Sequence, residues 1–429
     1  MPDRSQQPDR RQQPDRSRPP QRPQLPLWAG RTAALLGILL IALSLRSAVA
    51  ALSPIIDQIS HDIPLNPLVI GIIGAAPPVT FALTGLVTPW VSRKLGLEGA
   101  LLLAAVVMVL GHLARALAPN AVMLIVATTL TLVGAGIGNV LLPPVVKRYF
   151  PDRITQITTF YAVLIAISTA LPALAAVPVA DAFGWRASLG VWALLAVAAV
   201  APWAVASVRH RRAAARARLA DDGGVETEFA LEGRLLRSPV AWAVTIVFAI
   251  SSINVYAAFA WLPSLLVQSA HVSMAQAGSL LSLYAFVGFP TSLLTPYIAA
   301  RVKNVGLLVY FALACILIGY AGLIFAPAAA PALWIVIAGL GGMLFPLSLV
   351  LINTRTRTHA GSVALSGFVQ GFGYVIAAAG PLLFGILDQS TGGWSVPLIF
   401  LCVASLATIP AAIILTRGRF LEDELGAQA

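Results

Sequence analysis

Arg46 lies near the middle of the first long apolar segment, LLGILLIALSLRSAVAALSPII, and no other charged residue lies within that segment. A guanidinium group is costly in hydrocarbon, so such a residue is expected to face protein or water and to mark a functional site. Its planar fork of N–H donors suits a carboxylate, a nitro group, nitrate or the end of a linear anion such as cyanate. The alternative is that Arg46 donates only to backbone carbonyls of a broken helix and holds the structure together.

The sequence offers Arg46 no carboxylate partner, because no Asp or Glu lies deep in any apolar segment. On a helix, Asp57 would share the face of Arg46, Ala50 and Ser53. It would lie about 16 Å along the axis, too far for an ion pair. A buried cation without a partner keeps a large desolvation cost unless water, carbonyls, phenols or an arriving anion satisfy it. We therefore expect a cavity with a positive centre.

Other polar and aromatic side chains at mid-segment depth are candidates to line the same cavity and bind substrate. They are Asn139, Tyr161, Asn254, Trp261, Tyr284, Gln370 and Tyr374. Hydrogen bonding between packed helices is the open alternative for each of them. His112 is a candidate proton carrier, because imidazole changes charge near neutral pH. A packed histidine is the alternative there, and Asp57 is a second proton-linked candidate.

The composition indicates which elements position these residues. Hydrophobic residues make up 58% of the 429 residues and charged residues 10%, and the mean hydropathy is +0.86. These values indicate an all-α integral membrane protein with many spans. Apolar windows of about 20 residues, the length that crosses a bilayer, predict twelve spanning helices. The windows are 33–56, 68–91, 99–118, 121–146, 155–180, 187–207, 240–267, 277–300, 305–326, 332–352, 361–387 and 395–416.

The distribution of charge predicts the orientation. If the N-terminus lies inside, all of the 28 Lys and Arg residues except Arg46, Arg115 and Arg186 fall in the tails or in loops on the inner side. Cytoplasmic loops of membrane proteins are enriched in these residues. We therefore expect a multi-pass protein of the cytoplasmic (inner) membrane with both termini cytoplasmic. The net charge of +11 then gives no indication of nucleic-acid binding.

The chain contains an internal repeat, which predicts two pseudo-symmetric halves of six helices each. The segment LVTPWV at 86–91 matches LLTPYI at 293–298, and Pro172 corresponds to Pro381. The Pro- and Gln-rich N-terminal tail cannot bury apolar surface and is expected to be disordered. The expected units are the tail 1–30, the N-terminal half 31–207, a cytoplasmic linker 208–238, the C-terminal half 239–416 and the tail 417–429.

Two pairs of glycines have the spacing of closely packed helices. Gly134 and Gly138 form one pair, and Gly367 and Gly371 form the other. A fragment around Gly134 resembles a dinucleotide-binding loop, but no strand precedes it. We therefore expect both pairs to serve helix packing and movement.

Two tandem six-helix halves with both termini inside resemble the major facilitator superfamily. The resemblance implies that the halves rock about a central site at the bilayer midplane. The loop after the second span, GLVTPWVSRKLG, is similar to the gating signature of that superfamily. Gly85, Arg93 and Lys94 match the signature and are therefore expected to act in gating. Pro89 stands where the signature has an acid.

Two further motifs resemble the cyanate permease and 2-nitroimidazole transporter group. They are SLRSAVAALSPII in the first span and GIGNVLLPPVVKRYFPDR at 136–153. The group's first span carries Leu-Arg followed by a proline, and its fourth carries Gly-Asn-Val-Leu-Leu-Pro. The likeness implies a small anionic or nitro-bearing solute, cyanate-like or nitroimidazole-like.

We therefore expect a secondary transporter that works by alternating access and binds its solute at Arg46. The chain has no ATP-binding motif and no metal-binding spacing, so we expect no enzyme activity, no cofactor and no metal. Protons are a candidate coupling ion, and the monomer is the expected functional unit. The alternative is a multidrug or metabolite efflux antiporter of the same superfamily. A non-transporting membrane sensor is the remote alternative.

Overall fold

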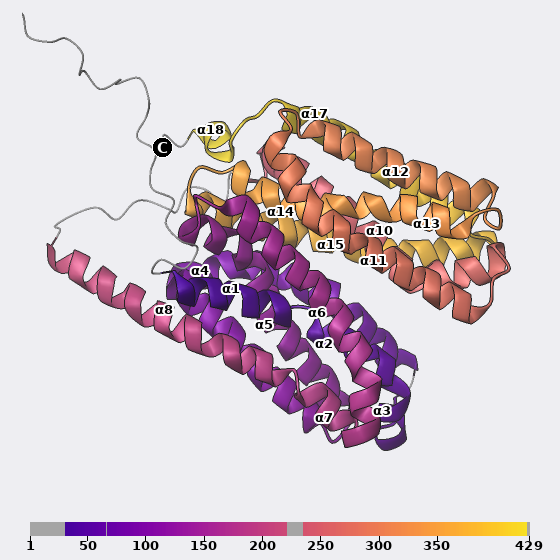
Figure 1. Ribbon diagram of the computed structural model, residues 1–429, viewed down its shortest axis with the longest axis horizontal. Coiled ribbons are helices and arrows are strands. Elements are labelled where there is room, and N and C mark those ends of the chain that lie inside the picture. The colour runs from indigo at the N-terminus through magenta and orange to yellow at the C-terminus, as the bar shows by residue number, and fades with distance from the viewer. Residues whose placement is uncertain (1–30, 66, 221–234, 427–429) are drawn as a thin grey trace, which may run out of the picture.

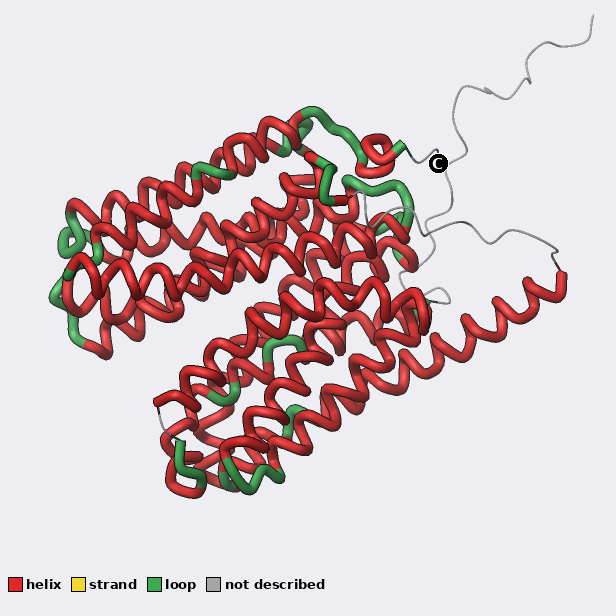
Figure 2. Tube along the Cα trace, turned by 180° about the vertical axis from the view of Figure 1, so that it is seen from behind, coloured by secondary structure: helices red, strands yellow, loops and turns green. Residues whose placement is uncertain are grey.

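The computed structural model describes residues 31–65, 67–220 and 235–426, and within these ranges every regular element is a helix (Figure 1). The tail 1–30, the central part of the predicted linker at 221–234 and the last three residues lie outside the described residues. Figure 2 shows the same all-helical arrangement from behind. The predicted all-α fold is therefore confirmed.

The described residues contain eleven helical stretches that are long and apolar enough to cross a membrane. Their bounds agree with the predicted windows to within a few residues, except that the second and third windows are continuous. The elements of the first half are α1 (Thr32–Ser44), α2 (Ser47–Ala50), η1 (Ser53–Ile55), α3 (Ile56–Asp62), α4 (Pro67–Ala116), α5 (Ala121–Tyr149), α6 (Ile154–Phe183), α7 (Trp185–Gly190) and α8 (Ala193–Ala220).

Helix α4 consists of two spans that reverse direction at Gly96. A straight helix of its 50 residues would be about 75 Å long. Ile73, near its start, and Ala118, just beyond its end, instead lie in one hydrophobic cluster. Gly96 has φ 73° and ψ 164°, a conformation that glycine adopts without a Cβ clash. Dividing α4 there turns the eleven stretches into the twelve predicted spans.

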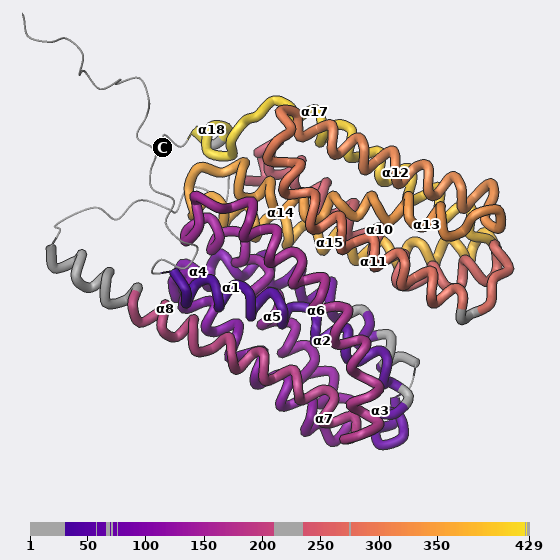
Figure 3. The backbone as a smooth tube through the Cα atoms, in the orientation of Figure 1, coloured from indigo at the N-terminus to yellow at the C-terminus, as the bar shows by residue number. Residues whose placement is uncertain are grey.

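The second half repeats this arrangement after the linker. Its elements are α10 (Pro239–Ser269), α11 (Met274–Arg301), α12 (Gly306–Phe325), α13 (Pro331–Leu340), η3 (Gly341–Met343), α14 (Leu344–Thr354), α15 (His359–Thr391), α16 (Ser395–Ser405), α17 (Thr408–Thr416) and α18 (Leu421–Leu425). The trace in Figure 3 completes one bundle from α1 to α8 before it builds the other. The two bundles lie together at one end and diverge toward the other (Figure 1).

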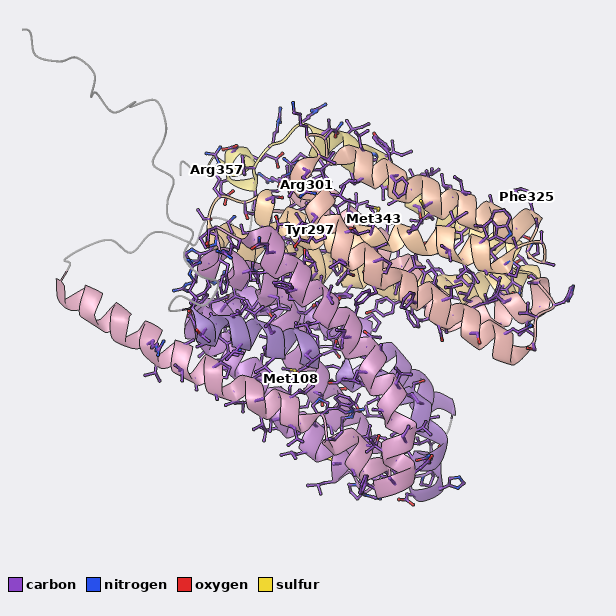
Figure 4. All side chains as sticks on the ribbon, viewed as in Figure 1. Met108, Tyr297, Arg301, Phe325, Met343 and Arg357 are labelled. Atoms are coloured by element: carbon purple, nitrogen blue, oxygen red, sulfur yellow. The ribbon has the colours of Figure 1, made fainter. Side chains whose placement is uncertain are left out.

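Basic residues mark the end at which the bundles meet, and we call it the basic end. Arg31, Arg148 and Arg153 lie there in the first half. Figure 4 labels Arg301 and Arg357 at this end of the second half and Phe325 at the opposite end. The Phe325 side chain is 84% exposed, and many other leucines, valines and phenylalanines are exposed along the helices. Such a broad apolar surface suits contact with lipid.

The two halves pack backbone to backbone near the basic end. A Cβ atom added at Gly85 in α4 would overlap the backbone of Gly371 in α15, and one added at Gly367 would overlap the ring of Pro89. Small residues allow helices in membranes to approach this closely. The second glycine pair of the sequence therefore lies at the junction of the halves.

At the opposite end, a carboxylate joins α3 to α7. Asp62 accepts hydrogen bonds from the indole Nε1 of Trp185 at 2.8 Å and from Nη1 of Arg186 at 2.7 Å. These two donors hold the pKa of Asp62 below its usual value, because both favour the charged form. Gln58 donates to Asp181 at 2.7 Å nearby. These contacts close this end of the first half within itself.

Candidate functional site

Arg46 lies at a break in the first span. Helix α1 ends at Ser44 and α2 begins at Ser47, with Arg46 in between. The hydroxyl of Ser44 donates to the carbonyl of Leu40 at 2.8 Å, and that of Ser47 donates to the carbonyl of Ser44 at 2.9 Å. Serine side chains that bond to the backbone in this way compete with regular helix formation.

A second interruption corrects one prediction from the sequence. The expected continuous face from Arg46 through Ala50 and Ser53 to Asp57 is wrong, because the helical turn that joins Arg46 to Ala50 is followed by a 3-10 turn that begins at Ser53. Pro54 contributes to the second interruption, since proline has no backbone N–H to donate. Asp57 lies in α3, and its side chain is outside the described part of the chain.

The guanidinium of Arg46 meets aromatic groups from both halves. Its Nη2 donates to the phenol oxygen of Tyr374 in α15 at 3.4 Å. Its Cζ lies 5.3 Å from the ring centroid of Phe81 in α4, which is a cation–π distance. The phenol of Tyr256 in α10 also faces it. The Arg46 side chain is partly exposed, and among the described residues no Asp or Glu pairs with it.

A set of buried amides connects this group across the two halves. Asn139 in α5 donates through Nδ2 to the phenol of Tyr374 at 3.1 Å and to Oε1 of Gln370 at 2.6 Å. Gln370 donates in return to the Asn139 carbonyl at 3.2 Å and to the Ser366 hydroxyl at 2.9 Å. We call Arg46, Asn139, Ser366, Gln370 and Tyr374 the inter-half network. Four of the predicted candidates therefore lie together.

Aromatic rings surround the phenol of Tyr374. The ring of Tyr374 lies 5.3 Å from Phe81 and 4.9 Å from Phe248, the latter edge to face, with Tyr256 at 6.5 Å. Aromatic faces and edges of this kind favour planar, polarised groups. A guanidinium fork beside such rings is chemically suited to a small planar anion or to a nitro group on an aromatic ring. Neither Phe81 nor Tyr256 stood out in the sequence.

Three other predicted candidates lie in packing contacts of the second half, away from the inter-half network. Asn254 donates to the Ile250 carbonyl at 2.7 Å and to Ser405 at 3.4 Å. Trp261 donates to the Pro381 carbonyl at 2.9 Å. Tyr284, the third of these, and Tyr161, the remaining candidate in the first half, are both buried. Tyr284 lies against the α13 backbone, and Tyr161 in α6 has no hydrogen-bond partner for its hydroxyl in the described ranges.

His112 in α4 contacts Ser47, the residue that follows Arg46. Its Nε2 is 3.4 Å from the hydroxyl of Ser47, and its side chain is fully buried. Arg115, one turn further along α4, is also fully buried, and none of its three guanidinium nitrogens has a partner in the described part of the chain. The partial exposure of Arg46 distinguishes it from Arg115, since only an exposed group can meet a solute.

The predicted gating residues lie at the basic end. Gly85 lies at the contact with Gly371 described above. Arg93 lines a surface pocket between the halves, and the Nζ of Lys94 lies 4.1 Å from the ring centroid of Trp90. All three therefore lie where the halves meet or beside that junction.

Lys147 makes several hydrogen bonds from the first half to the second, and the sequence did not single it out. Its Nζ donates to the carbonyl of Asn353 at 3.0 Å and to the hydroxyl of Thr356 at 2.7 Å. It also donates to the Thr356 carbonyl. The only sequence signal for this role is that Lys147 lies at the end of the fourth span, within the motif at 136–153. Its acceptors in the second half are uncharged, so no pattern of charges in the sequence identifies them.

The fold and this site define a membrane protein whose candidate site lies between two helical halves. A sequence model of the Major Facilitator Superfamily matches residues 34–378. The chain belongs to this superfamily. Like its relatives, it is therefore a membrane transporter and not an enzyme.

Several curated proteins are similar over most of their length. The 2-nitroimidazole transporter of Escherichia coli is 33% identical over 88% of this chain and 93% of its own. The cyanate transport protein CynX of the same organism is 28% identical, over 87% of this chain and 95% of its own. An uncharacterized transporter of Bacillus subtilis, YycB, is 33% identical over 88% and 91%. The predicted resemblance to the cyanate and nitroimidazole group is confirmed.

Solved structures agree with the fold. The proton:xylose symporter XylE aligns with a TM-score of 0.69 over 92% of this chain and 98% of its own, at 13% identity. FucP in its outward conformation aligns with a TM-score of 0.66 over 90% and 98%, also at 13% identity. At this identity the likeness concerns the fold alone.

Proposed function

We propose that this transporter carries a small anionic or nitro-bearing solute and binds it at Arg46 between the halves. The observation that carries the proposal is the uncompensated charge of Arg46. Its described neighbours are the phenols of Tyr374 and Tyr256 and the ring of Phe81, all of them neutral. A cation in such surroundings keeps a desolvation cost that an arriving anion removes. The names of two relatives, which concern cyanate and 2-nitroimidazole, support the same class of solute.

The inter-half network also suggests how binding is coupled to movement. Tyr374 and Gln370 belong to α15, whereas Arg46 and Asn139 belong to the first half. A solute held by both sides would favour the arrangement that brings those sides together, because a ligand shifts a conformational equilibrium by its difference in affinity for the two states. We therefore propose alternating access by rocking of residues 31–207 against 239–416.

The present arrangement corresponds, in this proposal, to a state open at the end opposite the basic end. The Gly85–Gly371 packing and the Lys147 hydrogen bonds keep the halves together at the basic end. We propose that the basic end is cytoplasmic, in accord with the distribution of Lys and Arg, and that the protein acts as a monomer in the cytoplasmic membrane. A gradient of the solute or of protons would drive transport.

A ligand screen by thermal shift tests the solute class. The purified protein would be heated with cyanate, nitrate, 2-nitroimidazole or a lipophilic cation, because a ligand that binds the native state raises its apparent stability. Arg46→Gln is the test variant, and Arg301→Gln, an exposed arginine outside the site, is the matched control. We expect a shift with the anions or the nitro compound that is lost in Arg46→Gln and kept in Arg301→Gln. A shift with lipophilic cations alone would favour the efflux alternative and reject the proposal.

A further inference from the structure

The short C-terminal helix α18 packs against the basic end of the second half (Figure 1). Its first residue, Leu421, is fully buried, and its backbone N–H donates to the carbonyl of Arg355 at 2.8 Å. The next residue, Glu422, is only 2% exposed. A carboxylate buried this deeply costs free energy unless donors satisfy it. The donors to Glu422 therefore indicate what the C-terminal segment holds in place.

The carboxylate of Glu422 holds the loop 355–358, which leads into α15. Both of its oxygens accept from the backbone N–H of Arg357 at 2.9 Å. Its Oε1 also accepts from the backbone N–H and from the hydroxyl of Thr358, each at 3.0 Å. Thr358 is the N-cap of α15, and a negative charge is favourable beside the first N–H groups of a helix. Glu422 therefore fixes this loop and the start of α15 together.

The same loop carries acceptors for Lys147 of the first half. The hydroxyl of Thr356 accepts from the Lys147 Nζ at 2.7 Å, and the Thr356 carbonyl accepts from the same atom. The carbonyl of Asn353, just before the loop, accepts from it at 3.0 Å. Glu422 is also close enough to Lys147 for their opposite charges to attract. The loop that receives the first half is thus itself held by the C-terminal segment.

A second carboxylate attaches α18 to the start of α10. Glu424 accepts from the hydroxyl of Ser238 at 2.6 Å and from the backbone N–H of Val240 at 3.2 Å. Ser238 is the N-cap of α10, so the two glutamates join the starts of α10 and α15. Both attachments lie within the second half. The C-terminal segment therefore moves with this half when the halves separate.

We infer that Glu422 is a positioning residue of the transport cycle. It holds the loop 355–358 in the shape that accepts Lys147, and thereby stabilises the state in which the halves meet at the basic end. Without Glu422, Thr356 would be ordered only when Lys147 arrives, and ordering a loop at that moment costs conformational entropy. The inference rests on the proposed alternating access, and it holds whichever solute is carried.

A double-mutant cycle on the full-length protein tests this role. Spin labels at Val208 in α8 and Leu307 in α12, which are 47% and 57% exposed, would report the distance between the halves at the basic end. The two native cysteines would be removed first. Glu422→Ala removes both carboxylate oxygens, whereas Glu422→Gln keeps one of them. Asp423→Asn, at a neighbouring carboxylate that is 44% exposed, is the matched control. Each variant would be made with Lys147 and with Lys147→Met.

Glu422→Ala should lower the ratio of the shorter to the longer distance by about threefold or more, since residues of one hydrogen-bond network couple on this scale. Glu422→Gln should lower it less. Asp423→Asn should leave it unchanged, because exposed ion pairs contribute little. In the Lys147→Met background, Glu422→Ala should cause no further fall. A helix cap that served stability alone would lower the melting temperature and leave the ratio unchanged in both backgrounds.

Two results would overturn the inference while leaving the proposed function intact. One is an equal fall of the ratio in both backgrounds, and the other is an unchanged ratio in Glu422→Ala although Lys147→Met lowers it. An unchanged ratio in Lys147→Met would overturn the proposed role of the Lys147 hydrogen bonds and this inference with it. If the alanine variant does not fold, Glu422→Gln serves for the same comparison.

Discussion

The guanidinium of Arg46 donates to the phenol of Tyr374 at 3.4 Å, although the two residues are 328 positions apart in the sequence. The bond connects the break in the first span to the middle of α15 and therefore crosses the junction of the two halves. Asn139 donates to the same phenol at 3.1 Å. One hydroxyl group thus connects the proposed binding cation to the amide network that holds the halves together.

Replacing Tyr374 with phenylalanine should weaken solute binding by about tenfold or more while the protein stays folded. The ring contacts with Phe81 and Phe248 remain, but the acceptor for Arg46 and Asn139 is lost. In the proposed complex the phenol O–H would donate to the bound anion. A hydrogen bond to a charged group contributes about 1.5–3 kcal/mol, and about 1.4 kcal/mol corresponds to a factor of ten. The half-saturating concentration for transport into vesicles measures the effect. Tyr320→Phe, a buried tyrosine of α12, is the control, and equal affinities of the two variants would contradict the role given to Tyr374.

Replacing Gly85 with alanine should separate the halves at the basic end. The added Cβ would overlap the backbone of Gly371. Because backbone atoms cannot rotate aside as a side chain can, α4 and α15 can make room only by moving apart. Spin labels at Val208 in α8 and Leu307 in α12, two exposed positions at the basic end of the two halves, should therefore report a longer distance. Gly278→Ala is a matched control, because a Cβ there meets nothing within 4 Å and alanine is the better helix former. If both alanine variants gave the same distance as the parent, the close packing of α4 on α15 would not control the gate.

Replacing Lys147 with methionine should favour the state open at the basic end. The substitution removes the hydrogen bonds to Asn353 and Thr356, which connect α5 to the other half. A hydrogen bond from a charged donor contributes about 1.5–3 kcal/mol. The population ratio of the state closed at the basic end to the state open there should therefore fall by about tenfold or more. The same pair of labels measures this ratio. Lys303→Met removes an exposed lysine of the basic end and should leave the ratio as it was. An unchanged ratio in Lys147→Met would contradict the proposal that the Lys147 hydrogen bonds keep the halves together at the basic end.

Replacing Arg115 with methionine should stabilise the protein. The guanidinium is fully buried and finds no partner in the described residues. Exchanging buried charges for apolar side chains of similar volume is often neutral or stabilising by about 1–4 kcal/mol. The apparent melting temperature in detergent should rise, and it should stay nearly constant in Arg301→Met, where the arginine is exposed. A clear fall in Arg115→Met would show that the group has an anionic or water partner in the folded protein.

The sequence was sufficient to predict the spans, because each is a run of apolar residues long enough to cross a bilayer. The bounds of α12, predicted as 305–326, are Gly306–Phe325 in the structure. Arg46 could be named as a candidate from the sequence as well, since a lone charge in an apolar segment is visible without knowledge of its neighbours in the fold. The break at Arg46 was not predictable from helical periodicity, because it involves the Ser44 and Ser47 hydroxyls that bond to the backbone.

The composition of the inter-half network was only partly predictable. The sequence names polar residues at depth, but it does not show whether such a residue bonds to its own helix or to the other half. Asn254 bonds to its own helix at Ile250, whereas Asn139 reaches Gln370 across the junction. Lys147 was missed for a related reason. Two of its acceptors are the backbone carbonyls of Asn353 and Thr356, and because every residue has a backbone carbonyl, the sequence does not identify them as partners.

Solute counterflow in vesicles that contain purified Arg46→Gln protein tests the central claim most directly. Vesicles preloaded with unlabelled cyanate or 2-nitroimidazole would be diluted into labelled solute, with the amount of inserted protein matched among variants. The parent and Arg301→Gln should accumulate label, and Arg46→Gln should be slower by about 30-fold or more, because losing one partner of a desolvated charge pair costs about 2–5 kcal/mol. Counterflow by Arg46→Gln at the parent rate would contradict the assignment of Arg46 as the group that binds the solute.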